Sequence, residues 1–214
     1  MLLGSASEIS NEYVDRSVSM LGKIYLENNC NCNCIVELGA GYGRLLSLLV
    51  LSLGSSNIKK FYALDYTDAA LRILTNIFGE SGYDAVMGKI DLGGTTEALD
   101  LPDWDHSLRP LVFSSQAIMY VPVLSEHFMG LMNYWRSGVF SFIEPSVFNL
   151  LASPLRSLQE RYLYINDYNT NLAEILIDQQ EKGVIKNLVI KADILSENAF
   201  LPLQSFNWQF LRLL

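Results

Sequence analysis

Cationic residues are scarce in this chain. Its 214 residues include 15 Lys and Arg against 23 Asp and Glu, which gives a formal net charge of −8. A protein that binds duplex nucleic acid needs a cationic surface, so this balance argues against nucleic acid as the main partner. Half of the residues are hydrophobic and 18% are charged, which is typical of a folded globular protein rather than a disordered one.

Long apolar runs and a targeting segment are lacking too. The most apolar stretch, residues 45–53, covers about two and a half helical turns, whereas a membrane span needs about 20 residues. Residues 1–15 lack the basic head and the apolar run of a signal peptide. We therefore expect a cytoplasmic protein with no membrane partner.

Cysteine is also rare, and all three cysteines lie close together as Cys30, Cys32 and Cys34. An odd number in a chain without an export signal argues against a disulfide framework. Structural zinc sites use four ligands, with cysteine pairs separated by two to four residues, and this spacing does not supply them. We expect reduced thiols and no metal site, with Cys34 as the first residue of a buried strand.

Short apolar runs alternate along the chain with segments of helical periodicity. Strands are predicted over residues 34–38, 60–64, 85–90, 111–115, 139–143, 184–190 and 205–213, the last at a sheet edge. Helices are predicted over residues 7–26, 43–53, 68–78, 125–135 and 155–182. This alternation predicts an α/β fold: a Rossmann-like, doubly wound, mostly parallel seven-stranded sheet with helices on both faces. We expect residues 1–214 to form one domain, with residues 1–30 as an N-terminal helical cap.

Three closely spaced glycines follow an acid at the end of the first predicted strand. Glu37 precedes Gly39, Gly41 and Gly43 in the sequence Glu-Leu-Gly-Ala-Gly-Tyr-Gly. Glycine adopts a positive φ at little cost and has no Cβ to keep a ligand away from the backbone. The N–H groups at the start of the next helix favour an anion such as a carboxylate. The loop is therefore predicted to bind a ligand at the carboxyl end of the sheet.

Two ligand classes compete for this loop. The dinucleotide fingerprint G-x-G-x-x-G would need its third glycine where Arg44 stands, which weakens a nicotinamide-dependent oxidoreductase. The pattern E-x-G-x-G-x-G instead resembles the first motif of class I S-adenosylmethionine (SAM) dependent methyltransferases, and the resemblance covers about residues 34–145. It implies that the loop holds the methionine half of SAM, with Glu37 near its ammonium group. The residues so implied are Glu37, Gly39, Ala40, Gly41, Tyr42 and Gly43.

Acids at the next strand ends fit the same resemblance. Asp65 ends the second strand, and its carboxylate can accept two hydrogen bonds from a ribose diol. Its neighbour Tyr66 has a flat face that suits adenine. At the third strand the more usual register of the family would place the acid at Lys89, whereas this chain has Asp91. The further residues implied at the cofactor are Asp91, Leu92, Ser114 and Gln116.

A looser similarity concerns the acceptor of the methyl group. The segments 142–145, 166–169 and 205–208 resemble a loose group of bacterial sugar O-methyltransferases associated with surface polysaccharide, which implies methylation of a sugar hydroxyl. A hydroxyl is a poor nucleophile that a general base would help, and Glu144 at the end of the fifth strand is the candidate. The candidate substrate contacts are Tyr120, Asn166 and Asn169.

The sequence thus predicts a SAM-dependent methyltransferase that acts on a small polar acceptor and leaves S-adenosylhomocysteine as product. The alternatives are a nicotinamide-dependent oxidoreductase and a non-catalytic SAM-binding module. The expected partner is a small molecule or a saccharide. The methylated atom, the general base, any metal dependence and the oligomeric state stay open at this point.

Overall fold

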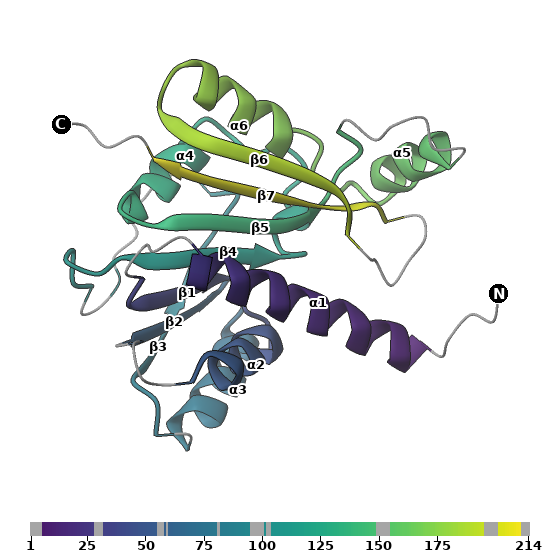
Figure 1. Ribbon diagram of the computed structural model, residues 1–214. Coiled ribbons are helices and arrows are strands. Elements are labelled where there is room, and N and C mark those ends of the chain that lie inside the picture. Colours follow the sequence, from purple (N-terminus) through teal and green to yellow (C-terminus); the bar gives the residue numbers. More distant parts are fainter. Residues whose placement is uncertain are drawn as a thin grey trace.

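Seven strands form one sheet through the middle of the structure (Figure 1). The computed structural model describes residues 6–27, 32–54, 58, 60–80, 82–94, 101, 104–148, 155–194 and 201–210. The strands are β1 (Cys34–Leu38), β2 (Lys60–Asp65), β3 (Ala85–Lys89), β4 (Pro110–Ser115), β5 (Val139–Pro145), β6 (Ile185–Ile194) and β7 (Leu203–Phe210). Their order along the sheet is β3-β2-β1-β4-β5-β7-β6, and the first five are parallel. The predicted Rossmann-like, mostly parallel sheet is confirmed.

The order of the strands reverses at β1. From β1 the chain adds β2 and β3 on one side, and then returns to add β4 and β5 on the other. Ligands of open α/β sheets bind at the carboxyl ends of the strands beside such a reversal. The residues that follow β1, β2 and β4 therefore meet at the edge where a ligand is expected.

The last strand corrects one prediction. Residues 205–213 are predicted from the sequence as an edge strand, but β7 lies between β5 and β6 and runs antiparallel to both. Neighbours on both sides explain why most of its side chains are buried. Trp208, for example, stacks on Phe140 of β5 with the ring centroids 4.9 Å apart. The outer strand on this side is β6, and residues 211–213 lie outside the described residues.

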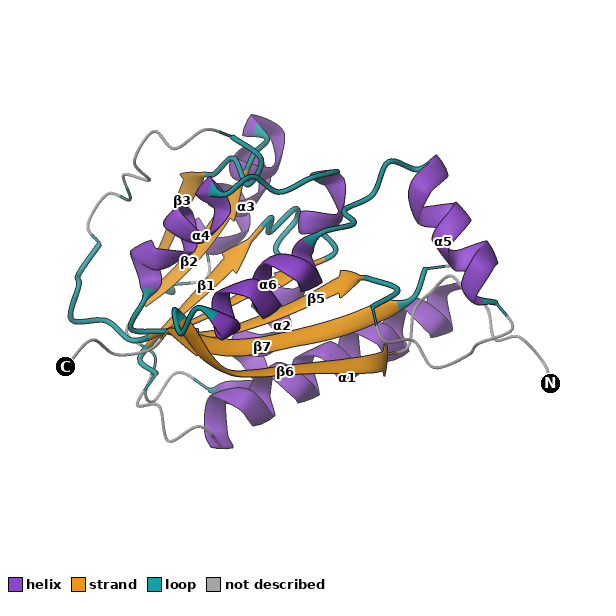
Figure 2. Cartoon of the chain, turned by 90° about the horizontal axis from the view of Figure 1, so that it is seen from above, coloured by secondary structure: helices purple, strands orange, loops and turns teal. Residues whose placement is uncertain are grey.

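Helices cover both faces of the sheet (Figure 2). The helices are α1 (Ala6–Glu27), α2 (Arg44–Leu53), α3 (Asp68–Gly79), α4 (His127–Met132), α5 (Arg156–Ile165) and α6 (Leu172–Glu181), with short 3₁₀ turns η1 (Ile118–Tyr120) and η2 (Asn133–Trp135). Side chains from α1, α2 and α3 form one core with Ile35, whereas those from α4 and α6 form the other with Val36. Successive residues of a strand point to opposite faces, so a strand covered on both is apolar without alternation.

The prediction of one long helix over residues 155–182 is wrong. The structure divides it into α5 and α6, and Asp167 between them has a φ of 54°. The Asn166 amide donates to the Tyr162 carbonyl at 2.8 Å at the end of α5. The Asn169 side chain accepts from the Leu172 N–H at 2.9 Å, where α6 begins. Asn and Asp side chains compete for backbone hydrogen bonds in this way, which makes them terminate helices more readily than continue them.

The predicted N-terminal helix is confirmed as α1, and it packs along α2. Tyr13, Val14 and Leu21 are buried in the shared core, and Arg44 of α2 donates to the Asn11 side-chain oxygen at 2.8 Å. Among the helices that the structure describes, none is both long enough and apolar enough to cross a bilayer. Residues 1–5 and 28–30 of the predicted cap lie outside the described residues.

The two described cysteines differ in oxidation state. Cys34 is free and fully buried at the start of β1, as predicted, and burial raises the pKa of its thiol to about 12. Cys32 is disulfide-bonded, so the prediction of a reduced thiol is wrong at this position. An odd number of cysteines excludes complete pairing, but it does not exclude one bond within a close group. Cys30 lies outside the described residues.

Candidate functional site

A cavity of about 710 Å³ lies where β1, β2, β3 and β4 end, beside the reversal of strand order. Its size falls in the range of small-molecule sites, about 300–1,000 Å³. Eight of the residues predicted at the cofactor line it: Gly39, Gly41, Tyr42, Asp65, Tyr66, Asp91, Leu92 and Gln116. Segments from four strand ends that are distant in sequence are therefore brought to one site, as the sequence predicts.

Four residues predicted at the cofactor do not line this cavity: Glu37, Ala40, Gly43 and Ser114. Glu37 and Ser114 are buried within the strands β1 and β4. Ala40 is buried in the core that contains α1 and α2. Gly43 caps the N-terminus of α2 with a φ of 72°. These residues support the loop from behind rather than forming the wall of the cavity.

The three glycines of the loop serve different steric needs. A Cβ on Gly39 would lie 2.1 Å from the Ala117 Cβ, and one on Gly43 would lie 2.6 Å from the Leu74 Cδ2. These two glycines are required by close packing within the protein. Gly41 lines the cavity, has a φ of 54°, and a Cβ built there meets no atom within 4 Å. Its missing side chain leaves space for a ligand rather than for another part of the chain.

Asp65 ties the glycine loop to the end of β2. Its Oδ2 accepts from the Gly41 N–H at 2.9 Å, and its Oδ1 accepts from both the N–H and the hydroxyl of Thr67 at 2.8 Å. The residue is 8% exposed and lines the cavity. An ionised carboxylate has about four acceptor positions, and these three bonds leave one for a ligand hydroxyl.

Glu37 is a buried acid with an unsatisfied oxygen. The side chain is 4% exposed, and its Oε2 has no hydrogen-bond partner. Burial raises the pKa of Glu37 well above its usual value, the nearby charge of Asp65 raises it further, and a hydrogen bond from the Leu46 backbone lowers it. Buried polar atoms without a partner are rare in folded proteins and point to a missing donor. This fits the role that the resemblance implies, an acid near the ammonium group of SAM.

An exposed ring and a second acid also line the cavity. Tyr66 is 62% exposed and lines the wall. Asp91 also lines it, and its Oδ1 accepts from the Gly93 N–H at 3.0 Å. Lys89, where the usual register of the family has its acid, instead pairs with Asp68 at 2.9 Å. This pairing lowers the pKa of Asp68 and raises that of Lys89. Asp91 is thus the acid after β3 that a ligand in the cavity would meet.

Glu144, the predicted general base, is fully enclosed. The residue is 1% exposed, and its carboxyl group accepts from the Ser114 hydroxyl at 2.6 Å, the Ala117 N–H at 3.2 Å and the Met119 N–H at 3.1 Å. Burial raises the pKa of Glu144 to about 7, against the lowering effect of these hydrogen bonds. Glu144 does not line the cavity at the strand ends, so the structure does not place it where a substrate would be. Glu144 instead fixes the turn between β4 and η1.

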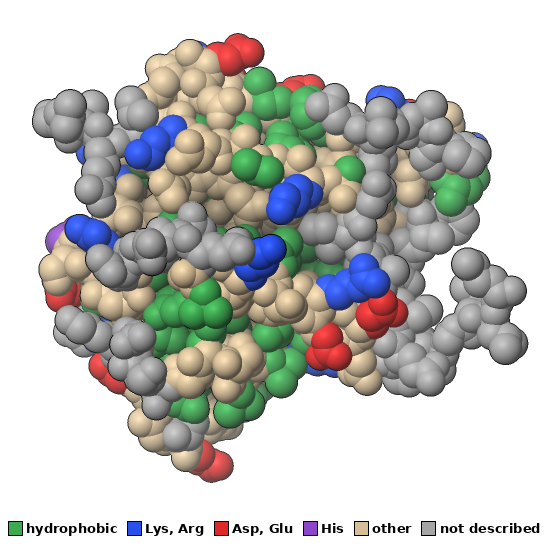
Figure 3. Space-filling model, viewed as in Figure 1, with side chains coloured by type: hydrophobic (Ala, Val, Ile, Leu, Met, Phe, Trp, Pro, Cys, Tyr) green, Lys and Arg blue, Asp and Glu red, His purple; other side chains and the backbone are tan. Residues whose placement is uncertain are grey.

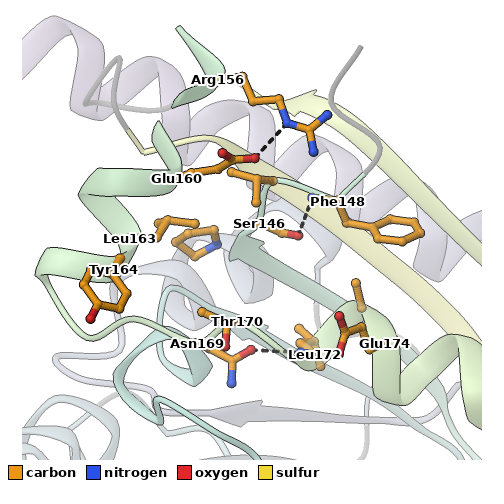
Figure 4. A pocket seen from close by; sticks show the side chains of 13 residues that line it. Ser146, Phe148, Arg156, Glu160, Leu163, Tyr164, Asn169, Thr170, Leu172 and Glu174 are labelled. Carbon is orange, nitrogen blue, oxygen red and sulfur yellow. Dashed lines mark hydrogen bonds and ion pairs between the residues drawn. The ribbon is translucent and has the colours of Figure 1, made fainter. Parts of the chain in front are cut away.

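The three residues predicted to contact the substrate do not lie at one site. Tyr120 is 70% exposed and lines the cavity at the strand ends. Asn169 is 5% exposed and lines a second cavity, of about 570 Å³, beside the end of β5 (Figure 4). Asn166 lines neither of these two cavities.

Some residues of the first cavity were not predicted from the sequence. They are Thr67, Ala69, Ala70, Ile90 and Ala117. Thr67 also caps α3 by accepting from the Ala70 N–H at 3.3 Å. In the sequence, a threonine at this position therefore indicates the start of a helix rather than a ligand contact. Small residues that follow a predicted strand end are a weak signal of this kind, because they are equally common in plain turns.

Metal-binding groups are not found in the part of the chain that the structure describes: no three His, Cys, Asp or Glu side chains lie together as ligands would.

Solved structures of other proteins share this fold. No protein-family model matches the sequence, and no curated protein matches it. A SAM-dependent methyltransferase from Aquifex aeolicus is similar in structure, with a TM-score of 0.53 and 14% identity over 98% of this chain and 100% of that one. A protein from Galdieria sulphuraria, assigned provisionally as a sarcosine dimethylglycine methyltransferase, has a TM-score of 0.60 and 12% identity over 90% of this chain and 84% of that one. A protein from Bacillus halodurans, assigned provisionally as a methyltransferase, has a TM-score of 0.53 and 13% identity over 82% of this chain and 72% of that one. The chain therefore has the fold of class I methyltransferases.

Proposed function

We propose that this protein is a SAM-dependent methyltransferase that acts on a small polar acceptor. The observation that carries the proposal is the cavity at the strand reversal, where Gly41 leaves open space and Asp65 offers a carboxylate. The fold shared with solved methyltransferases supports the same conclusion.

The residues present fit SAM in three parts. Gly41 and Tyr42 in the wall, with Glu37 behind it, would hold the methionine half. The remaining acceptor position of Asp65 suits a ribose hydroxyl. Tyr66 and Asp91 would hold the adenine by ring contact and by accepting from its amino group.

The reaction needs alignment more than strong acid–base chemistry. When bound, SAM supplies an activated methyl group whose bond to sulfur breaks as the acceptor atom bonds to the carbon, the acceptor proton passing to water. Asp65 and Asp91 are the acids among the described residues that line the cavity. The chain's contribution is then to hold the acceptor in line with the methyl group. The buried Glu144 would serve this by holding the turn that carries Ala117, a residue of the wall.

The strand order also argues against a nicotinamide-dependent oxidoreductase. Dinucleotide-binding folds have the strand order 3-2-1-4-5-6. Here an antiparallel strand, β7, is inserted between β5 and β6. Arg44, which stands in place of the third glycine of the fingerprint, is bonded to Asn11.

A sugar hydroxyl remains the first acceptor class to test, because the sequence resemblance implies it. The acidic balance of the chain supports a small molecule rather than nucleic acid as acceptor. On the face in Figure 3, Lys and Arg side chains are scattered among the described residues and do not form a continuous cationic surface.

Calorimetric titration with S-adenosylhomocysteine tests the proposal. We expect saturable binding with one molecule per chain and no binding of NADH. A folded protein that binds NADH but not S-adenosylhomocysteine would refute it. Incubation of methyl-labelled SAM with neutral sugars and glycosides then separates an enzyme from a binding module, because only an enzyme transfers the label.

A further inference from the structure

The second cavity is lined by residues that follow β5 and by residues of α5 and α6 (Figure 4). The chain forms it where β5 ends, between α5 and the first turn of α6. Like the first cavity, it opens at the carboxyl ends of the parallel strands. Its volume of about 570 Å³ is that of a small-molecule site.

Hydrogen bonds and a ring contact connect the segments that line the two cavities. Asn169 of the second cavity donates from its backbone N–H to the Met119 carbonyl at 2.9 Å, and from its amide to the Val121 carbonyl at 2.7 Å. The ring of Tyr120, in the wall of the first cavity, meets the ring of Tyr168 edge to face at 5.9 Å. A molecule bound in the second cavity therefore lies next to the place proposed for SAM.

The wall of the second cavity is mostly apolar. Phe148 from the segment after β5, Leu163 from α5 and Leu172 from α6 all line it (Figure 4). Asn169 has little hydrogen-bonding capacity left for a ligand. Its amide donates to the Val121 carbonyl and its oxygen accepts from the Leu172 N–H. A ligand with an apolar body would replace water here favourably.

The charges around this cavity disfavour an anion. Arg156 pairs with Glu160 at 2.8 Å, so its positive charge is already neutralised. The carboxylate of Glu174 has no ion pair among the described residues, which leaves the wall with one guanidinium against two carboxylates. The net charge of −8 on the whole chain adds a general repulsion of anions.

We propose that this α5–α6 cavity binds the body of the methyl acceptor, and that the acceptor has an apolar part and no negative charge. The inference rests on the proposed function for the role of acceptor. It excludes sugar phosphates and nucleotide sugars, and it favours neutral or cationic compounds such as glycosides with an apolar aglycone. The reactive end of such a molecule would reach past Tyr120 into the first cavity.

Three probes and two matched variants test this inference by calorimetry in the presence of S-adenosylhomocysteine. Hexyl β-glucoside has the apolar part, glucose lacks it, and glucose 1-phosphate adds the negative charge. Thr170→Trp places a large ring in the wall of the cavity at an exposed position. Thr75→Trp makes the same change at an exposed position on α3, away from both cavities.

We expect hexyl β-glucoside to bind the wild type at least about ten-fold more tightly than glucose or glucose 1-phosphate. Thr170→Trp should weaken that binding by about ten-fold or more, and Thr75→Trp should leave it unchanged. Equal binding to the two tryptophan variants, no binding of hexyl β-glucoside to the wild type, or tighter binding of glucose 1-phosphate would overturn the inference. A wild type that takes up hexyl β-glucoside but not S-adenosylhomocysteine would instead refute the proposed function, which keeps the two failures distinct.

Discussion

The Asp65 carboxylate accepts a hydrogen bond from the Gly41 backbone N–H at 2.9 Å, across 24 positions of sequence. The bond joins the loop after β1 to the end of β2, and both residues line the same cavity. The same carboxylate accepts twice from Thr67, which begins α3. Asp65 thus fixes the shape of the cavity wall and also presents an acceptor to a ligand.

Replacing Asp65 by Asn should weaken S-adenosylhomocysteine binding. The amide has one acceptor oxygen in place of two, so either Gly41 or Thr67 loses its partner and the charge toward a ribose hydroxyl disappears. Hydrogen bonds to charged groups contribute about 1.5–3 kcal/mol, which corresponds to roughly ten-fold or more in affinity. The matched control is Asp68→Asn, an exposed acid three positions later that pairs with Lys89. Calorimetry on both variants checks this, and equal affinities would contradict it.

Alanine at position 41 should mainly weaken ligand binding, whereas alanine at position 39 should mainly lower the stability of the fold. Gly41→Ala adds a Cβ that meets no protein atom within 4 Å, so stability should fall only by about 1 kcal/mol for the positive φ. Binding of S-adenosylhomocysteine should fall much more. Gly39→Ala forces a Cβ to 2.1 Å from the Ala117 Cβ, and we expect roughly 1–3 kcal/mol of destabilisation from overpacking. Thermal unfolding and calorimetry measure the two effects separately, and the same response in both variants would contradict the assignment.

The sequence was informative where the signal is local. The glycine loop, Asp65 and Asp91 each follow a recognisable strand, and parallel strands bring their carboxyl ends together, so one cavity at those ends could be predicted. Glu144 looked the same from sequence, an acid at a strand end. Its enclosure depends on Ser114, 30 positions earlier, and on the backbone of the turn that follows β4.

The α5–α6 cavity could not be predicted for a related reason. Helical periodicity runs through residues 155–182 and conceals the break at Asn166 to Asn171. Asn169 stabilises that break by bonding to Val121, 48 positions earlier. Pairings of this range carry no periodic signal, because they depend on how the elements pack.

Asn169 should matter for stability far more than Asn166. Asn169→Ala removes the acceptor that begins α6 and the donor to the Val121 carbonyl, so we expect a loss of about 2–3 kcal/mol. Asn169→Asp keeps the acceptor for the Leu172 N–H but sets a buried carboxylate oxygen against the Val121 carbonyl, so it should recover little of that loss. Asn166→Ala removes one exposed bond to the Tyr162 carbonyl and should cost about 0.5 kcal/mol. Urea unfolding of the three variants checks the order, and an equal cost for both alanine variants would contradict it.

Glu144 should make the protein less stable as pH rises toward neutrality. Its pKa is about 7 in the folded protein, whereas 4.5 is the usual value, so the folded state holds a proton that the unfolded state has released. Stability therefore falls as pH rises between these two values and levels off above about pH 8. Glu144→Gln cannot titrate, and the wild type should lose on the order of 2 kcal/mol relative to it between pH 5 and pH 8. Other titrating groups, including Glu37, are common to both proteins and cancel in the comparison. Chemical unfolding of both proteins at several pH values measures this difference. A constant difference across the range would mean that Glu144 stays ionised throughout, held by Ser114 and the N–H groups of the turn.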